Sequence, residues 1–313
     1  MGTSSTRLTG RLASAAVFPA GRAGHELHDV ALPDGERVRV VHCPPASTGG
    51  PPGGGSAAGS APVVVCVHGW GCSLYSYNKV LRPVADAGCD VWAPDVRGHG
   101  WSDKPLDPVR YTPDALGGWV VALLDRLQLD RAILVGHSMG GAVVMQAALQ
   151  APDRIAGLLL LAPVGFGAIP RTRLLRMATP RWLDPVLPYL AWRALIAIGL
   201  RTGYGRIGRP SARDIDEYWA PTADPDFARA SRLVAHAFNW EPGDPEGLAR
   251  VACPVHLLLG ERDNLVPGGL ARTHAERLAR VQVDEVPGAG HVLPEEVPEV
   301  VVRAIVDDAR AWW

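Results

Sequence analysis

The chain has 313 residues, of which 47% are hydrophobic and 20% are charged, so it holds enough apolar material for a large core in one domain or two smaller ones. The formal net charge of −1 gives no basic footprint of the kind that nucleic acids attract, so we expect no nucleic-acid partner. No apolar run reaches the roughly 18 residues of a membrane helix, which argues against stable insertion in a membrane.

The five cysteines are scattered along the chain and contain no Cys-x-x-Cys pair. Such a set favours neither a disulfide framework nor a zinc site, and it indicates reduced thiols in a cytoplasmic protein. The apolar stretch at 12–20 is too weak for the core of a signal peptide.

The first part of the chain predicts a leader, a hairpin and a long loop. Residues 1–24 are expected to form a loose N-terminal leader. Residues 25–32 and 37–42 flank Pro33-Asp34-Gly35, which is a turn signal between two short strands. The stretch 44–61 is rich in Gly, Pro and Ser and cannot bury apolar surface, so it predicts a mobile surface loop.

Buried apolar runs then alternate with helical segments. Thr112-Pro113-Asp114 is typical of a helix N-terminus, because it combines a capping hydroxyl, a proline and an acidic first turn. The alternation indicates an α/β protein with a mostly parallel, doubly wound sheet covered on both faces. The predicted strands are 63–67, 90–94, 132–135, 157–162, 255–260 and 281–286, and the predicted helices are 75–87, 112–127, 141–149 and one from about 297 onward.

The alternation breaks between about 166 and 250. This segment contains several prolines, many Arg and Trp residues, and helical fragments. We interpret it as an inserted helical cap, which leaves 25–165 and 251–313 as the two parts of the core.

The segment Gly136-His137-Ser138-Met139-Gly140 joins a predicted strand to a predicted helix. A Gly-x-Ser-x-Gly segment in this setting is typical of a nucleophile elbow, a strained turn that lifts the serine hydroxyl off the end of the sheet. Small residues are needed beside the serine because the turn crowds the following helix. The pattern therefore predicts Ser138 as a nucleophile.

Other segments accompany the elbow at the ends of predicted strands: His68-Gly69-Trp70-Gly71, the stretch Asp-Val-Arg-Gly-His-Gly-Trp-Ser at 95–102, Gly-Glu-Arg-Asp-Asn-Leu-Val-Pro at 260–267, and Gly-Ala-Gly-His-Val-Leu-Pro at 288–294. Together they resemble the α/β-hydrolase superfamily, in a serine-nucleophile, esterase- or lipase-like form with a helical cap, over roughly residues 25–313. The resemblance implies an α/β-hydrolase fold and a triad that runs nucleophile, acid, base along the chain.

The resemblance places the acid at Asp263 and the base at His291. Glu261 is the rival acid, but the family's acid stands two positions beyond it, just before Val-Pro. A buried acid holds the imidazole in one tautomer, and a neutral histidine takes the serine proton near pH 7. His291 follows the last predicted strand, so it is expected at the same sheet edge as Ser138.

The oxyanion hole needs two backbone N–H groups. One is expected from Met139, the residue after the nucleophile, and the other from Trp70, in a segment that resembles the family's His-Gly-x. His68 is expected to be structural. Arg97 and His99 are interpreted as parts of a structural turn.

A serine nucleophile indicates acyl transfer through a tetrahedral oxyanion and an acyl-enzyme that water then cleaves. Haloalkane dehalogenases and epoxide hydrolases of this fold use aspartate there, so we expect both to resemble this chain poorly. The predicted function is hydrolysis of a carboxylic ester of a small or medium apolar substrate, with no metal and no organic cofactor. Trp70, His137 and Trp192 are candidates for contact with this small-molecule substrate.

Other functions stay open on the same triad. Carbon–carbon hydrolases of aromatic ring cleavage often have Asn before the serine, where this chain has His137, and cofactor-free perhydrolases often carry His-Gly-Trp-Pro, where this chain has Gly71. A lactonase or thioesterase is also compatible with these residues. A non-catalytic ligand-binding protein of this fold is a further alternative, against which the intact Ser138, Asp263 and His291 argue.

Overall fold

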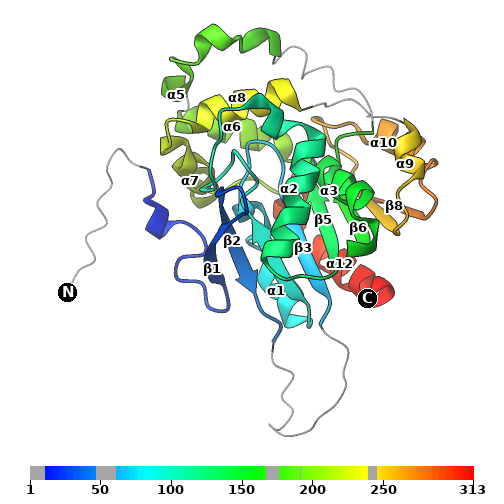
Figure 1. Ribbon diagram of the computed structural model, residues 1–313. Coiled ribbons are helices and arrows are strands. Elements are labelled where there is room, and N and C mark those ends of the chain that lie inside the picture. The colour runs from blue at the N-terminus through cyan, green and yellow to red at the C-terminus, as the bar shows by residue number, and fades with distance from the viewer. Residues whose placement is uncertain (1–10, 47–60, 167–175, 191, 239–244) are drawn as a thin grey trace, which may run out of the picture.

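A computed structural model describes residues 11–46, 61–166, 176–190, 192–238 and 245–313, so most of the predicted mobile loop at 44–61 lies outside the described residues. A sheet of eight strands, in the order β1-β2-β4-β3-β5-β6-β7-β8, runs through the centre of the molecule (Figure 1). β2 pairs with β1 and β4 in the antiparallel sense, and the other neighbours are parallel. The strands are β1 (Glu26–Ala31), β2 (Arg37–Cys43), β3 (Val63–Val67), β4 (Asp90–Pro94), β5 (Ala132–His137), β6 (Ile155–Leu161), β7 (Val255–Gly260) and β8 (Val281–Val286).

Apolar side chains cover both faces of the sheet. On β3, Val65 and Val67 belong to one core and Val64 and Cys66 to the other, because successive side chains of a strand point to opposite faces. The first core contains residues of α2 (Pro113–Arg126) and α3 (Met139–Gln150), and the second contains residues of α1 (Leu81–Asp86) and α12 (Pro298–Trp312). Helices therefore pack on both faces (Figure 1), which confirms the predicted doubly wound α/β sheet.

The predicted helix at 75–87 is wrong in its first half. Residues Leu74–Tyr77 form a separate 3-10 turn, and α1 begins only at Leu81. Pro83 explains the late start, because proline is tolerated in the first turn of a helix but removes a hydrogen bond from its interior. The predicted start of α2 is confirmed, since the Thr112 hydroxyl accepts a hydrogen bond from the backbone N–H of Ala115 at 3.2 Å.

The described parts of the segment between β6 and β7 are mainly helical. Its helices α5 to α8 gather at one end of the sheet (Figure 1), as expected of an inserted cap. The helices of this segment are α5 (Leu187–Leu190), α6 (Arg193–Gly203), α7 (Ala212–Trp219), α8 (Phe227–Ala237) and α9 (Pro245–Ala249), and the remaining ones beyond it are α10 (Gly268–Ala275) and α11 (Leu293–Glu296).

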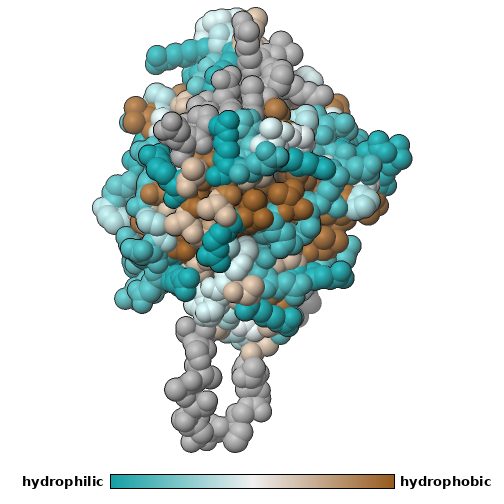
Figure 2. Space-filling view, turned by 90° about the vertical axis from the view of Figure 1, so that its right-hand side faces the viewer, coloured by the Kyte–Doolittle hydropathy of each residue, from teal (hydrophilic) through white to brown (hydrophobic). Residues whose placement is uncertain are grey.

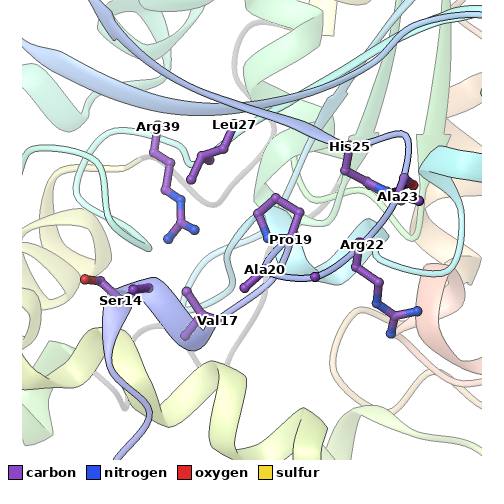
Figure 3. A pocket seen from close by; sticks show the side chains of 11 residues that line it. Ser14, Val17, Pro19, Ala20, Arg22, Ala23, His25, Leu27 and Arg39 are labelled. Carbon is purple, nitrogen blue, oxygen red and sulfur yellow. Dashed lines mark hydrogen bonds between the residues drawn. The ribbon is translucent and has the colours of Figure 1, made fainter. Parts of the chain in front are cut away.

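The N-terminal segment differs from the predicted loose leader over residues 11–24. The ring of Phe18 is buried, its backbone N–H donates to the carboxylate of Glu217 at 2.9 Å, and its carbonyl accepts from the guanidinium of Arg39 at 2.9 Å. Both partners are distant in the sequence, so no local sequence pattern predicts that Phe18 packs there. A cavity of about 420 Å³ lies between this segment and the hairpin, with Pro19, Leu27 and Arg39 in its wall (Figure 3).

The edge of the sheet at β8 is partly open to solvent. Val281 and Val283 of this strand are exposed, and so is Leu270 of α10. Figure 2 views the molecule from this side and shows apolar side chains gathered across the middle of the face. Among the helices of the described part of the chain, none is both long enough and apolar enough to cross a membrane.

Candidate active site

Ser138 occupies a strained turn between β5 and α3. Its φ of 54° and ψ of −118° lie in a backbone region that residues other than glycine rarely adopt. The backbone N–H of Ser138 donates to the carbonyl of Leu161 at 2.9 Å, which holds the turn against β6. A Cβ atom on Gly140 would lie 2.2 Å from the carbonyl oxygen of Val67, so the next turn of the chain also requires glycine.

The segment His68-Gly69-Trp70 passes directly beside Ser138. A Cβ atom on Gly69 would lie 3.0 Å from the Cβ of Ser138. His68 has the structural role expected of it: it is buried, and its Nε2 accepts from the backbone N–H of Val96 at 2.9 Å. Met139 is the first residue of α3, so its N–H has no acceptor within the helix.

His291 and Asp263 form a buried hydrogen-bonded pair. The Nδ1 of His291 donates to Oδ2 of Asp263 at 2.7 Å. The other carboxylate oxygen, Oδ1, accepts from the backbone N–H groups of Leu265 and Val266, both at 2.8 Å. The carboxylate is thus held on both sides, and the free ring nitrogen of His291 is Nε2.

His137 links the elbow to the loop of His291. Its Nε2–H donates to the carbonyl of His291 at 2.9 Å, and the two ring centroids lie 5.0 Å apart. Burial, followed by the proximity of His291, lowers the pKa of His137 to about 3, so this ring stays neutral. The contact places His291 next to the residue that precedes Ser138.

The other candidates have different surroundings. Trp70 is half-buried, and its Nε1–H donates to the carbonyl of Ser231 on α8 at 3.0 Å. Trp192 lies at the N-terminus of α6 with 64% of its surface exposed, so most of this side chain faces solvent. The rival acid Glu261 accepts from the backbone N–H of Gly288 at 2.8 Å instead of contacting His291.

The Asp-x-Arg-Gly-His-Gly-x-Ser segment forms a buried structural turn, as predicted. Arg97 donates through Nε to the carboxylate of Glu36 at 2.7 Å. His99 is fully buried and donates through Nδ1 to the carbonyl of Arg97 at 3.0 Å. Burial is the main cause that lowers the pKa of His99 to about 3, which suits a neutral ring in a packed turn.

Glu296 joins the His291 loop to the segment that follows α6, and no sequence motif indicates this role. Its carboxylate accepts from the backbone N–H of Gly290 at 2.8 Å, of Gly205 at 3.0 Å and of Ile207 at 3.1 Å. These partners are known only from the tertiary structure, since two of them lie about ninety residues away in the chain. The neighbouring Glu295 is also buried, which raises its pKa to about 7.

Replacing Glu296 with glutamine is expected to lower both stability and turnover. The amide keeps one acceptor oxygen but turns an NH2 group toward a backbone N–H, which then has no acceptor. A buried donor without a partner lowers the free energy of unfolding by about 1–3 kcal/mol. We expect kcat to fall about tenfold, because the loop that carries His291 loosens. A fluorophosphonate, which labels an activated serine, should still label the same residue as in the wild type. Urea unfolding and ester turnover measure the two effects.

The matched control for this change is Glu299→Gln, which makes the same replacement at an exposed position of α12. It is expected to change stability by less than about 0.5 kcal/mol. A Glu296→Gln protein with reduced stability but wild-type kcat would show that Glu296 only supports the fold.

The fold and these contacts define an α/β hydrolase, and comparison with known proteins agrees. The chain belongs to the alpha/beta hydrolase fold family, whose model matches residues 62–298. An uncharacterized hydrolase, YugF of Bacillus subtilis (strain 168), is 30% identical over 262 residues, which cover 78% of this chain and 88% of that protein. The solved structure of the epoxide hydrolase CorEH without ligand matches with a TM-score of 0.75 and 21% identity, covering 92% of this chain and 99% of that one.

One expectation about relatives is wrong for the chain as a whole. A haloalkane dehalogenase of Mycolicibacterium paratuberculosis (strain ATCC BAA-968 / K-10) is 27% identical over 240 residues, which cover 68% of this chain and 75% of that protein. Similarity therefore extends to the dehalogenase and epoxide-hydrolase classes, because the scaffold is shared.

Proposed function

We propose that this protein is a serine hydrolase that cleaves a carboxylic ester of a small or medium apolar substrate. The observation that carries the proposal is the strained Ser138, whose neighbour His137 contacts His291, a histidine with its Nδ1 held by the Asp263 carboxylate at 2.7 Å. Nucleophile, acid and base follow one another in the chain order of α/β hydrolases.

In the proposed mechanism, His291 Nε2 takes the proton of the Ser138 hydroxyl as Oγ attacks the ester carbonyl. The oxyanion accepts hydrogen bonds from the backbone N–H groups of Met139 and Trp70. His291 then gives its proton to the departing alcohol, which leaves an acyl-enzyme. A water molecule, activated by the same ring, releases the carboxylic acid and restores Ser138.

The serine favours acyl transfer over the reactions of the dehalogenase and epoxide-hydrolase relatives. Attack by Ser138 on an alkyl carbon would leave an ether on the enzyme, and water activated by His291 cleaves an ester far more readily than an ether. A carboxylate nucleophile avoids this problem because its alkyl intermediate is itself an ester. Trp70 follows Gly69, which lies beside Ser138, and packs against the apolar core, so it supports an apolar substrate.

Labelling with a fluorophosphonate tests the proposal. Intact-mass spectrometry should find one adduct on the wild-type protein, none on Ser138→Ala, and one on the control Ser14→Ala, which changes a serine of the N-terminal segment. A panel of p-nitrophenyl esters of increasing acyl length then ranks substrates. A folded wild-type protein without an adduct and without esterase activity would favour a non-catalytic ligand-binding protein.

A further inference from the structure

Three metal-ligating side chains that the proposed reaction does not use converge on the first hairpin. Glu26 and His28 lie on β1, and His42 lies on β2. Glu26 stands directly opposite His42 in the strand register. His28 follows Glu26 by two residues, so both side chains point to the same face of the strand.

Two of the three distances between these side chains match the edges of a tetrahedral site. Glu26 Oε2 lies 3.3 Å from His42 Nδ1 and 3.6 Å from His28 Nε2, and one ligand atom from each residue lies within 4.8 Å of the others. Zinc binds imidazole nitrogen and carboxylate oxygen at about 2.0–2.2 Å, which places neighbouring ligand atoms about 3.3–3.6 Å apart.

His42 has the outer partner that a metal-binding histidine usually has. Its Nε2 lies 2.6 Å from Oδ1 of Asp90, whose other oxygen accepts from Trp92 Nε1 at 3.0 Å. The Trp92 ring stacks on His42 with centroids 3.8 Å apart and planes 11° from parallel. A carboxylate on one ring nitrogen fixes the tautomer and presents the other nitrogen, here Nδ1, to the metal.

A protonated His42 bridging Glu26 and Asp90 is the simpler explanation of the same contacts. It leaves one atom unexplained, because His28 Nε2 is buried and has no hydrogen-bond partner among the described residues. A cation between Glu26 and the two histidines would provide this partner. Nitrogen ligands favour a transition metal over Ca²⁺ or Mg²⁺, which prefer oxygen.

We propose that Glu26, His28 and His42 bind one divalent transition-metal ion, best suited to zinc, with Asp90 as the outer partner of His42. The ion joins β1 to β2 at the edge of the sheet, where β1 has β2 as its strand neighbour. Its role is structural and separate from the chemistry at Ser138. The proposal departs from the expectation, drawn from sequence motifs, that the chain has no metal ligands.

Zinc binding to the untagged, full-length protein after EDTA treatment tests this site. Isothermal titration with zinc chloride at pH 7.5 should give one equivalent for the wild type. Glu26→Gln and His28→Gln should each weaken binding more than tenfold, and Asp90→Asn should weaken it about 10- to 100-fold. The wild-type midpoint of thermal unfolding should rise with zinc, whereas the double variant Glu26→Gln/His28→Gln should show no rise.

The control is His274→Gln, which removes a half-buried histidine of α10 outside the cluster and should leave the zinc affinity unchanged. Because Glu26 and His28 have side chains that are 56% and 42% exposed, their replacements should fold without the metal. Absence of stoichiometric zinc binding by the wild type would overturn the proposal. Zinc binding that survives both single replacements would place the ion elsewhere and would overturn it as well.

Discussion

Replacing His291 with alanine is expected to lower kcat for an activated ester by roughly 10⁴- to 10⁶-fold, the range seen when the base of a serine triad is removed. The physical reason is that Ser138 loses the acceptor for its proton. Asp263 cannot replace it, because its Oδ1 is held by the N–H groups of Leu265 and Val266 and its Oδ2 faces the Nδ1 side of the ring, opposite the Nε2 that takes the proton. Stopped-flow or long-time-course assays on a p-nitrophenyl ester measure the loss.

The double variant Ser138→Ala/His291→Ala tests whether the two residues act together. If the two residues act as one unit, removing both costs about as much as removing either one. Independent contributions would multiply, and such a result would contradict the proposed proton transfer from Ser138 to His291. The control His274→Gln should keep wild-type turnover.

The replacement Asp263→Asn should lower kcat by about 10⁴-fold while the fold is kept. Two backbone N–H groups bind Oδ1 of Asp263, so the amide oxygen of asparagine stays on that side. The amide NH2 then faces His291 Nδ1 and can only donate to it. The proton of the ring is thereby moved to Nε2, where it blocks acceptance of the serine proton.

Glu261→Gln is the matched control, since Glu261 is the nearest acidic residue in the sequence and is partly exposed. It should change kcat by less than about twofold, in keeping with surface replacements. A larger loss for Glu261→Gln than for Asp263→Asn would show that the acid has been assigned to the wrong residue. Near-ultraviolet circular dichroism of both variants checks that the fold is retained.

Much of the fold could be predicted from the sequence because the signals are local. Each buried strand is a short apolar run that ends at a turn, and β3, β4 and β7 coincide with the predicted ranges, as does the exposed edge strand β8. The elbow could also be predicted, because small residues are required beside Ser138 by atoms only a few residues away and by one neighbouring strand. The assignment of Asp263 over Glu261 came from family resemblance, and the hydrogen bond to His291 agrees with it.

The parts that were missed depend on contacts between distant segments. The docking of Phe18 needs Glu217 and Arg39, and the role of Glu296 needs Gly205. The prediction of a helix at 75–87 was wrong for another reason. Proline is tolerated in the first turn of a helix but not in its interior, and the sequence does not show that the helix begins only at Leu81.

The sequence by itself determined the sheet and the elbow segment around Ser138, because periodicity and turn chemistry act over a few residues. The order of nucleophile, acid and base follows from the family resemblance and belongs to the proposed function. Only the tertiary structure decided what surrounds them: the hold of Glu296 on the His291 loop and the convergence of Glu26, His28 and His42. Hydrogen bonds and ligand sites require atoms within about 3–4 Å. Residues far apart in the chain reach such distances only when the strands and helices pack together.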